Sequence, residues 1–149
     1  MTPYEMIRDH LDAAVPFARH VGIDLVEIGD GTARATLDQR EAVSNHIQTV
    51  HAGAMFTLAE AASGAAVAGA LAPVILKMRP VAAEAQIRYM KIAQGRLTAK
   101  AKTARPGADL MEAIRTDGKV SFAVDVDLSN EAAETVAEMT VTWHVSPAR

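Results

Sequence analysis

Residues 52–71 read AGAMFTLAEAASGAAVAGAL, and this stretch decides the fold of the 149-residue chain. Alanine has the highest helix propensity of the amino acids, so we expect one long helix here despite three glycines. A helix with so few polar side chains must be buried nearly all round. The rest of the chain is therefore expected to wrap around this helix.

Glu60 is the only charged residue in this stretch, and His51 directly precedes the first residue of the stretch, Ala52. Burying a lone carboxylate is costly unless the group is paired or takes up a proton. Glu60 is therefore the first candidate functional residue and His51 is the second. In the alternative reading, the hydroxyls of Thr57 or Ser63 satisfy the carboxylate and His51 only caps the helix.

The same stretch is about long enough to span a membrane. Its apolar residues are mainly alanine and glycine, and Glu60 lies near the middle, where a charge is most costly. Pro73 follows closely, and the remaining chain alternates like the strands of a water-soluble sheet. We therefore expect no membrane span.

The composition indicates one globular domain over residues 1–149. Half of the residues are apolar, and the formal net charge of −3 gives no electrostatic case for binding nucleic acid. The absence of cysteine excludes disulfides, thiolate metal sites and thiol nucleophiles. Acidic residues among the first dozen positions argue against a signal peptide, so a cytoplasmic protein is expected.

The N-terminal segment, residues 1–21, is expected to form a helical cover over the domain. It starts with a threonine cap, a proline and an acid at the capping-box position, in the order Thr2, Pro3, Tyr4, Glu5. Pro16 interrupts the pattern, and Gly22 is expected to end a second short helix. One apolar face at helical spacing comprises Tyr4, Ile7, Leu11 and Val15.

Six segments are expected to be strands, with a hairpin between the first two and a short helix from Asp109 to just before Asp117. The strands are residues 22–28, 32–37, 81–89, 95–105, 120–128 and 137–145. Clean alternation of apolar and polar side chains indicates an antiparallel sheet with one packed face. In the third strand, that face is predicted to comprise Val81, Ala83, Ala85, Ile87 and Tyr89.

His51 and Glu60 are nine residues apart, which corresponds to a rise of ~13 Å along a helix. The two side chains cannot meet within one chain. Two such helices running antiparallel about a two-fold axis would bring His51 of one chain near Glu60 of the other. If the residues act together, we expect two identical sites at a dimer interface.

Three further residues near the helix start are candidates. Gly53 lies in the first turn, where backbone N–H groups lack intrahelical partners and suit a developing oxyanion. Asn45 can donate to a carbonyl or orient a water, although asparagine in a loop is more commonly a turn residue. His46 and His51 have no further ligand at a metal-binding spacing, so no metal is expected.

These residues together resemble a known family. Asn45, then His51-Ala52-Gly53-Ala54, then Glu60 with Ser63 and Gly64, is similar to the pattern of the hotdog-fold acyl-CoA thioesterases of the PaaI-like type. Residues 87–91 followed by Gly95 resemble the strand after the helix in that family, and the resemblance covers roughly residues 22–145. Ala52 replaces a glycine and Ile92 a common proline of the pattern, and residues 109–117 and Trp143 look like a less characterised branch.

The resemblance implies an α+β hotdog fold, in which a six-stranded antiparallel sheet wraps one long central helix. It also implies homodimers that join two sheets, often paired again into homotetramers, with acyl-CoA or a similar thioester bound between subunits. No separate cofactor, nucleic acid or membrane is implied.

Carried over to this chain, the family pattern assigns Glu60 as general base or nucleophile and the Gly53 N–H as oxyanion donor. Asn45 and His51 would polarise the thioester or hold water, while Ala52, Ser63 and Gly64 would shape the substrate pocket. Two other activities stay open. One is a non-catalytic binder of acyl-CoA or a small ligand, and the other is a hotdog dehydratase or hydratase, in which the histidine and the acid are further apart.

Overall fold

The computed structural model describes all residues from Met1 to Arg149 and contains four α-helices and one six-stranded sheet. The helices are α1 (Pro3–Ala14), α2 (Pro16–Val21), α3 (Ala52–Ala70) and α4 (Gly107–Asp117). The strands are β1 (Asp24–Gly29), β2 (Thr32–Leu37), β3 (Met78–Tyr89), β4 (Leu97–Thr103), β5 (Val120–Ser129) and β6 (Thr135–Pro147).

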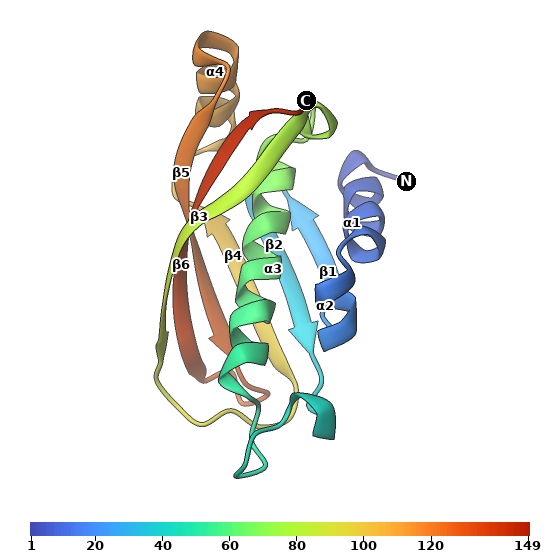
Figure 1. Ribbon diagram of the computed structural model, residues 1–149, viewed down its shortest axis with the longest axis vertical. Helices are drawn as coiled ribbons and strands as arrows, with labels where there is room; N and C mark the ends of the chain where they lie inside the picture. The colour runs from blue at the N-terminus through green and yellow to red at the C-terminus, as the bar shows by residue number, and fades with distance from the viewer.

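The sheet has the order β1-β2-β4-β5-β6-β3, and every neighbouring pair is antiparallel. It curls around α3, which runs along its concave side (Figure 1). This arrangement confirms the predicted α+β hotdog fold. The connection from β2 to β4 includes α3 and the outer strand β3, so the central helix precedes four of the six strands in the chain.

Helix α3 is buried over 13 of its 19 residues, as its alanine-rich sequence predicts. Its small side chains allow close approach: a methyl group added to Gly69 would overlap the carbonyl oxygen of Gly29 in the β1–β2 hairpin. The positions that are not buried fall on one side of the helix, at helical spacing. They are Ala52, Gly53, Phe56, Glu60, Ala61 and Gly64.

Strand β3 forms one edge of the sheet and is exposed over most of its 12 residues. It begins at Met78, before the predicted start, because an edge strand tolerates a proline such as Pro80. A bulge between Ala82 and Glu84 changes the register with β6. This bulge changes which side chains of β3 face the helix, compared with the prediction.

Side chains of directly paired residues share a face of the sheet. Beyond the bulge, Ile87 pairs with the buried Met139 and shares the helix-facing side. Before it, Ala82 pairs with the buried Trp143, so Val81 points to the opposite face. The prediction that Val81 continues the face of Ala85, Ile87 and Tyr89 is therefore wrong, because one residue inserted between Ala82 and Glu84 inverts the alternation.

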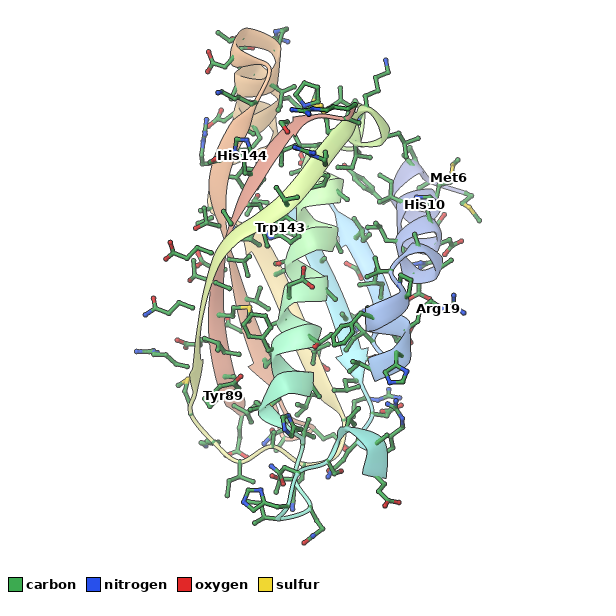
Figure 2. All side chains as sticks on the ribbon, viewed as in Figure 1. Met6, His10, Arg19, Tyr89, Trp143 and His144 are labelled. Carbon is green, nitrogen blue, oxygen red and sulfur yellow. The ribbon has the colours of Figure 1, made fainter.

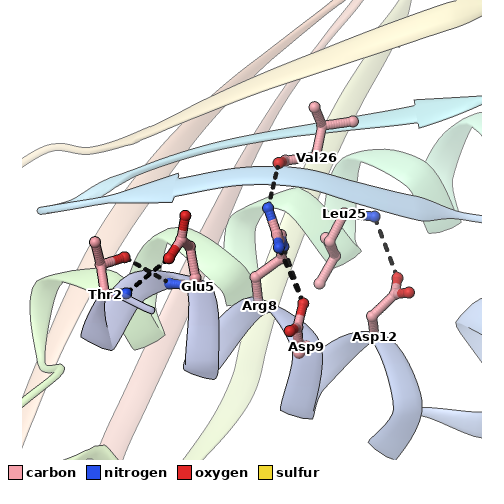
Figure 3. Close-up of polar contacts among 7 residues, drawn as sticks. All are labelled: Thr2, Glu5, Arg8, Asp9, Asp12, Leu25 and Val26. Carbon is pink, nitrogen blue, oxygen red and sulfur yellow. Dashed lines mark hydrogen bonds and ion pairs between the residues drawn. The ribbon is translucent and has the colours of Figure 1, made fainter.

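Helix α1 lies along β1, the other edge of the sheet, as Figures 1 and 3 show, and α2 packs against α3. The predicted capping box is present, with Glu5 N–H donating to Thr2 Oγ1 and Thr2 N–H to the Glu5 carboxylate. Further along α1, Arg8 donates to the carbonyl oxygen of Val26 at 3.3 Å. The carboxylate of Asp12 accepts the N–H of Leu25 at 3.2 Å, which holds α1 against the strand. Gly22 caps the C-terminus of α2, and its φ of 96° is the left-handed conformation that glycine adopts without strain.

None of the helices combines the length and the hydropathy that crossing a membrane would require, and this includes the alanine-rich α3.

Candidate active site

The side chain of Glu60 projects from the middle of α3 into an apolar cavity of ≈ 220 Å³. The cavity lies between α3 and the N-terminal helices, and Trp143 forms part of its wall. No side chain or backbone group of the chain donates a hydrogen bond to the Glu60 carboxylate. Burial without a partner raises the pKa of this carboxyl above its ordinary value.

The hydroxyls nearest in sequence do not satisfy this carboxylate. Thr57 Oγ1 donates to the carbonyl oxygen of Gly53 at 2.9 Å. Ser63 Oγ donates to the backbone oxygen of Glu60, not to its side chain, at 2.7 Å. The interpretation that the hydroxyl of Thr57 or Ser63 donates a hydrogen bond to the Glu60 carboxylate is therefore wrong.

Ser63 instead joins α3 to the sheet behind the cavity. Its hydroxyl accepts the indole N–H of Trp143 at 3.0 Å, and both residues are buried. Figure 2 shows Trp143 beside the middle of α3. Gly64 lines the cavity where the indole packs on the helix: a Cβ there would lie 3.3 Å from the ring. Of the three residues predicted to shape the pocket, Gly64 lines this cavity, Ser63 positions its wall, and Ala52 lines a different pocket.

His51 caps the N-terminus of α3. Its Nδ1 accepts the backbone N–H of Gly53 at 2.7 Å, so the proton of the neutral imidazole is on Nε2. A Cβ on Gly53 would lie 3.0 Å from Nδ1, which explains why glycine suits this position. The predicted oxyanion donor is thus engaged within the chain, whereas the N–H of Ala52 has no acceptor.

Tyr89 was not among the residues predicted for the site. Its hydroxyl donates to the carbonyl oxygen of Ala52 at 2.9 Å, joining the end of β3 to the first turn of α3. Figure 2 places Tyr89 at this end of the molecule. Partial burial raises the pKa of the Tyr89 phenol. The only sequence signal is a tyrosine at the end of an otherwise aliphatic strand face.

Asn45 organises the loop that leads into α3. Its side-chain oxygen accepts the N–H groups of Ile47 and Thr49 at 3.1 and 3.0 Å, and its amide donates to Thr49 Oγ1 at 2.7 Å. One amide hydrogen remains without a partner in this arrangement. Asn45, Ala52 and Tyr89 line a second pocket of ≈ 370 Å³.

Within the chain, the predicted site residues fall into two separate groups. Glu60 and Gly64 line the cavity beside α1 and α2, while Asn45 and Ala52 line the pocket at the start of α3. The two cavities share no residue. No three histidine, aspartate or glutamate side chains converge to hold a metal ion, and His46 and His51 belong to no such group.

A family model described as "Domain of unknown function (DUF4442)" matches residues 5–145. No protein among the curated sequences is similar enough to count as a relative.

Solved structures give clear matches. A Pseudomonas aeruginosa protein of unknown function, named a probable thioesterase, has a TM-score of 0.83 and 24% identity over 99% of this chain and 97% of its own. The PaaI protein of the E. coli phenylacetic acid degradation operon has a TM-score of 0.77 and 22% identity, and the match covers 95% of this chain and 92% of the PaaI chain. A hypothetical thioesterase from Streptococcus pneumoniae, solved with coenzyme A, has a TM-score of 0.66 and 23% identity, and the match covers 86% of this chain and 88% of that protein. These matches confirm the resemblance to PaaI-like hotdog proteins at the level of the fold.

Proposed function

Because the chain belongs to the DUF4442 family, whose description assigns no activity, we propose its function from the site: hydrolysis of an acyl-CoA or similar thioester. Water attacks the thioester carbonyl carbon while Glu60 takes its proton, or the Glu60 carboxylate attacks directly and water later releases the acyl group. In either route the carbon–sulfur bond breaks, the thiolate takes up a proton, and a carboxylic acid and a free thiol are formed.

The observation that carries this proposal is the unpaired carboxylate of Glu60 facing an apolar cavity. A structural acid at this depth would be expected to have a partner. Partial desolvation makes the carboxylate a stronger base and leaves it available to a water or a carbonyl carbon. Coenzyme A in the Streptococcus pneumoniae relative supports a coenzyme A thioester as the substrate class.

The complete site is proposed to form between two subunits. Strand β3 presents an unpaired edge of 12 residues, and such an edge is normally covered in a native assembly. The uncovered stripe of α3 includes Glu60 at its middle and Gly53 at its start. An isologous dimer that pairs β3 with β3 and packs α3 antiparallel to α3 would place the partner's His51 beside Glu60.

The groups at the start of α3 would then act on the substrate held by the other subunit. The Nε2–H of His51 and the free N–H of Ala52 are donors for the thioester oxygen. The Gly53 N–H joins them when the imidazole turns away from it, and the unpartnered amide hydrogen of Asn45 can position the attacking water.

The first test compares wild-type protein with Glu60→Ala, measuring thiol release from acyl-CoA substrates. The variant should keep the same oligomeric state and lose hydrolysis by at least ~100-fold, the usual contribution of a general base. Glu60→Gln preserves the side-chain shape, although glutamine can still hold water. Equal turnover by wild type and Glu60→Ala would disprove the catalytic role of this carboxylate.

The second test addresses the shared site. Glu60→Ala and His51→Ala subunits, each inactive alone, are mixed under conditions that allow subunit exchange. A heterodimer then has one intact site, so random exchange should recover about a quarter of the wild-type activity. If Glu60 and His51 of the same chain were needed together, the mixture would stay inactive.

One observation favours a second candidate, a non-catalytic binder of acyl-CoA. The Gly53 N–H, which a thioesterase would offer to the oxyanion, already donates to His51. A binder would be stabilised against thermal unfolding by coenzyme A esters without releasing any thiol. The same substrate panel therefore separates the two functions.

A further inference from the structure

The cavity beside Glu60 is partly open to solvent, and its wall is mostly apolar. Eight of its 12 lining residues are hydrophobic. Leu11 and Val15 contribute from the N-terminal helical segment, Leu25 from β1, and Trp143 from β6. Apart from Asp12 and Glu60, no charged side chain reaches it.

We propose that this cavity receives the acyl group of the substrate and admits only compact, uncharged acyl groups, such as short aliphatic chains or a single aromatic ring. The proposal rests on the proposed thioesterase function and names its substrate class. The carbonyl carbon would lie beside Glu60, with the acyl group directed toward α1 and the thiol portion toward the subunit interface.

The size limit follows from the cavity volume. A cavity of ~150 Å³ in another protein holds one benzene molecule, so ≈ 220 Å³ accommodates one ring or a chain of a few carbons. A fatty acyl chain of sixteen carbons would have to displace part of the wall. Leu11 is half-buried in this wall, opposite the helix that bears Glu60.

The wall formed by α1 is fixed in place. Arg8 donates to the carbonyl oxygen of Val26, and Asp12 accepts the N–H of Leu25, so α1 is tied to β1 on both sides of Leu11 (Figure 3). A longer acyl group that extends toward α1 would have to break these contacts. Leu11 is therefore expected to set the depth of the cavity.

The charge limit follows from the two acidic residues. Asp12 and Glu60 both line the cavity, and no lysine, arginine or histidine does. An acyl group that ends in a second carboxylate would meet two like charges and no counter-charge in an apolar wall. Dicarboxylic acyl groups should therefore be excluded, while neutral groups of the same length are accepted.

The experiment measures kcat/KM for butyryl-, benzoyl-, octanoyl-, palmitoyl- and succinyl-CoA with wild type, Leu11→Ala and Ile7→Ala. Ile7 is half-buried one turn earlier on α1 but does not line the cavity, so it is the matched control. Wild type should prefer butyryl- and benzoyl-CoA over palmitoyl- and succinyl-CoA by more than ~10-fold, the discrimination one methylene can give in an apolar pocket. Leu11→Ala should raise the kcat/KM for octanoyl-CoA relative to that for butyryl-CoA by ~10-fold or more, and Ile7→Ala should leave this ratio unchanged.

Trp143 supplies a readout that does not depend on activity, because it is the only tryptophan of the chain and lines the cavity. A non-hydrolysable butyryl thioether of coenzyme A should change its fluorescence, and coenzyme A alone should not. Hydrolysis of palmitoyl-CoA as fast as butyryl-CoA, or no fluorescence change with an active enzyme, would overturn the cavity assignment and leave the thioesterase intact. A fluorescence change without hydrolysis of any substrate would disprove the thioesterase and keep the cavity as the acyl site.

Discussion

The imidazole Nδ1 of His51 accepts the backbone N–H of Gly53 at 2.7 Å, and this bond makes the two residues mutually dependent. Because Gly53 has no side chain, the imidazole of His51 can lie close to its backbone. The imidazole accepts the Gly53 N–H, which has no acceptor within the helix. The bond also fixes the tautomer, so the Nε2–H points away from the cap as a donor. One histidine can therefore serve both the helix and a ligand.

Substitutions of His51 should separate these two roles. His51→Ala removes the cap and should lower the free energy of unfolding by about 1 kcal/mol, as measured by chemical denaturation. His51→Ser keeps a capping hydroxyl and should recover most of this stability. Both variants should lose thioester hydrolysis, because neither retains an imidazole. Full activity in His51→Ser would show that the residue is a cap and nothing more.

Tyr89→Phe should loosen the start of α3. The change removes the hydrogen bond to the carbonyl oxygen of Ala52, which is worth about 1 kcal/mol at a partly exposed position. Chemical denaturation should show this loss. The kcat/KM should also fall, because the bond that is removed holds Ala52 in place, and the N–H of Ala52 is a proposed donor to the thioester oxygen. Tyr4→Phe is the matched control, since Tyr4 is half-buried and its hydroxyl has no partner in the chain. An equal effect in both variants would contradict a specific role for Tyr89.

The fold was predictable because its strongest signals are local. The alanine-rich stretch around Glu60 identifies α3, the alternation around Val124 identifies β5, and the Thr2–Glu5 capping box identifies α1. Each pattern is decided by residues within one element. The bulge at Ala83 has no such signal, because Ala83 and the preceding Ala82 are small apolar residues that fit either face. Its position depends on how β3 meets β6, which is a tertiary property.

The candidate site was predictable only in part, for the same reason. Glu60 was identified because a lone acid in an apolar helix is conspicuous in any sequence. Its cavity depends on Leu11, which is far away in the chain and comes close only when α1 docks on β1. The bond from Tyr89 to Ala52 joins residues 37 positions apart. Such partners are fixed by the fold, so residue spacing alone does not indicate them.

Two glycines of α3 should respond differently to the same substitution. Gly69→Ala places a methyl group on the carbonyl oxygen of Gly29, so helix and hairpin must separate, at a cost of about 1–3 kcal/mol. Gly64→Ala meets the Trp143 ring at 3.3 Å, a tight contact that a small ring shift relieves. The higher helix propensity of alanine, about 1 kcal/mol, should then leave stability nearly unchanged. Equal thermal shifts for the two variants would contradict this packing.

The last prediction concerns the dependence of stability on pH. Burial raises the pKa of Glu60 in the folded state, so the folded protein binds this proton more tightly than the unfolded chain. Stability therefore falls as pH rises from the ordinary carboxyl pKa of about 4.3 through the raised value, and the loss persists above it. Glu60→Gln has no such proton and should be more stable than wild type at pH 7.

The advantage of Glu60→Gln over wild type should shrink as the pH is lowered toward 4, because the wild-type carboxyl then becomes protonated in the folded state. Thermal unfolding of both proteins between pH 4 and pH 8 measures this difference, and Glu84→Gln on the exposed β3 controls for the loss of one negative charge. In the same range, wild-type kcat/KM should rise with pH as Glu60 ionises, since only the carboxylate can act as base or nucleophile. A constant stability difference across the range would mean that Glu60 is ionised throughout because a partner group holds its carboxylate, which contradicts an unpaired Glu60.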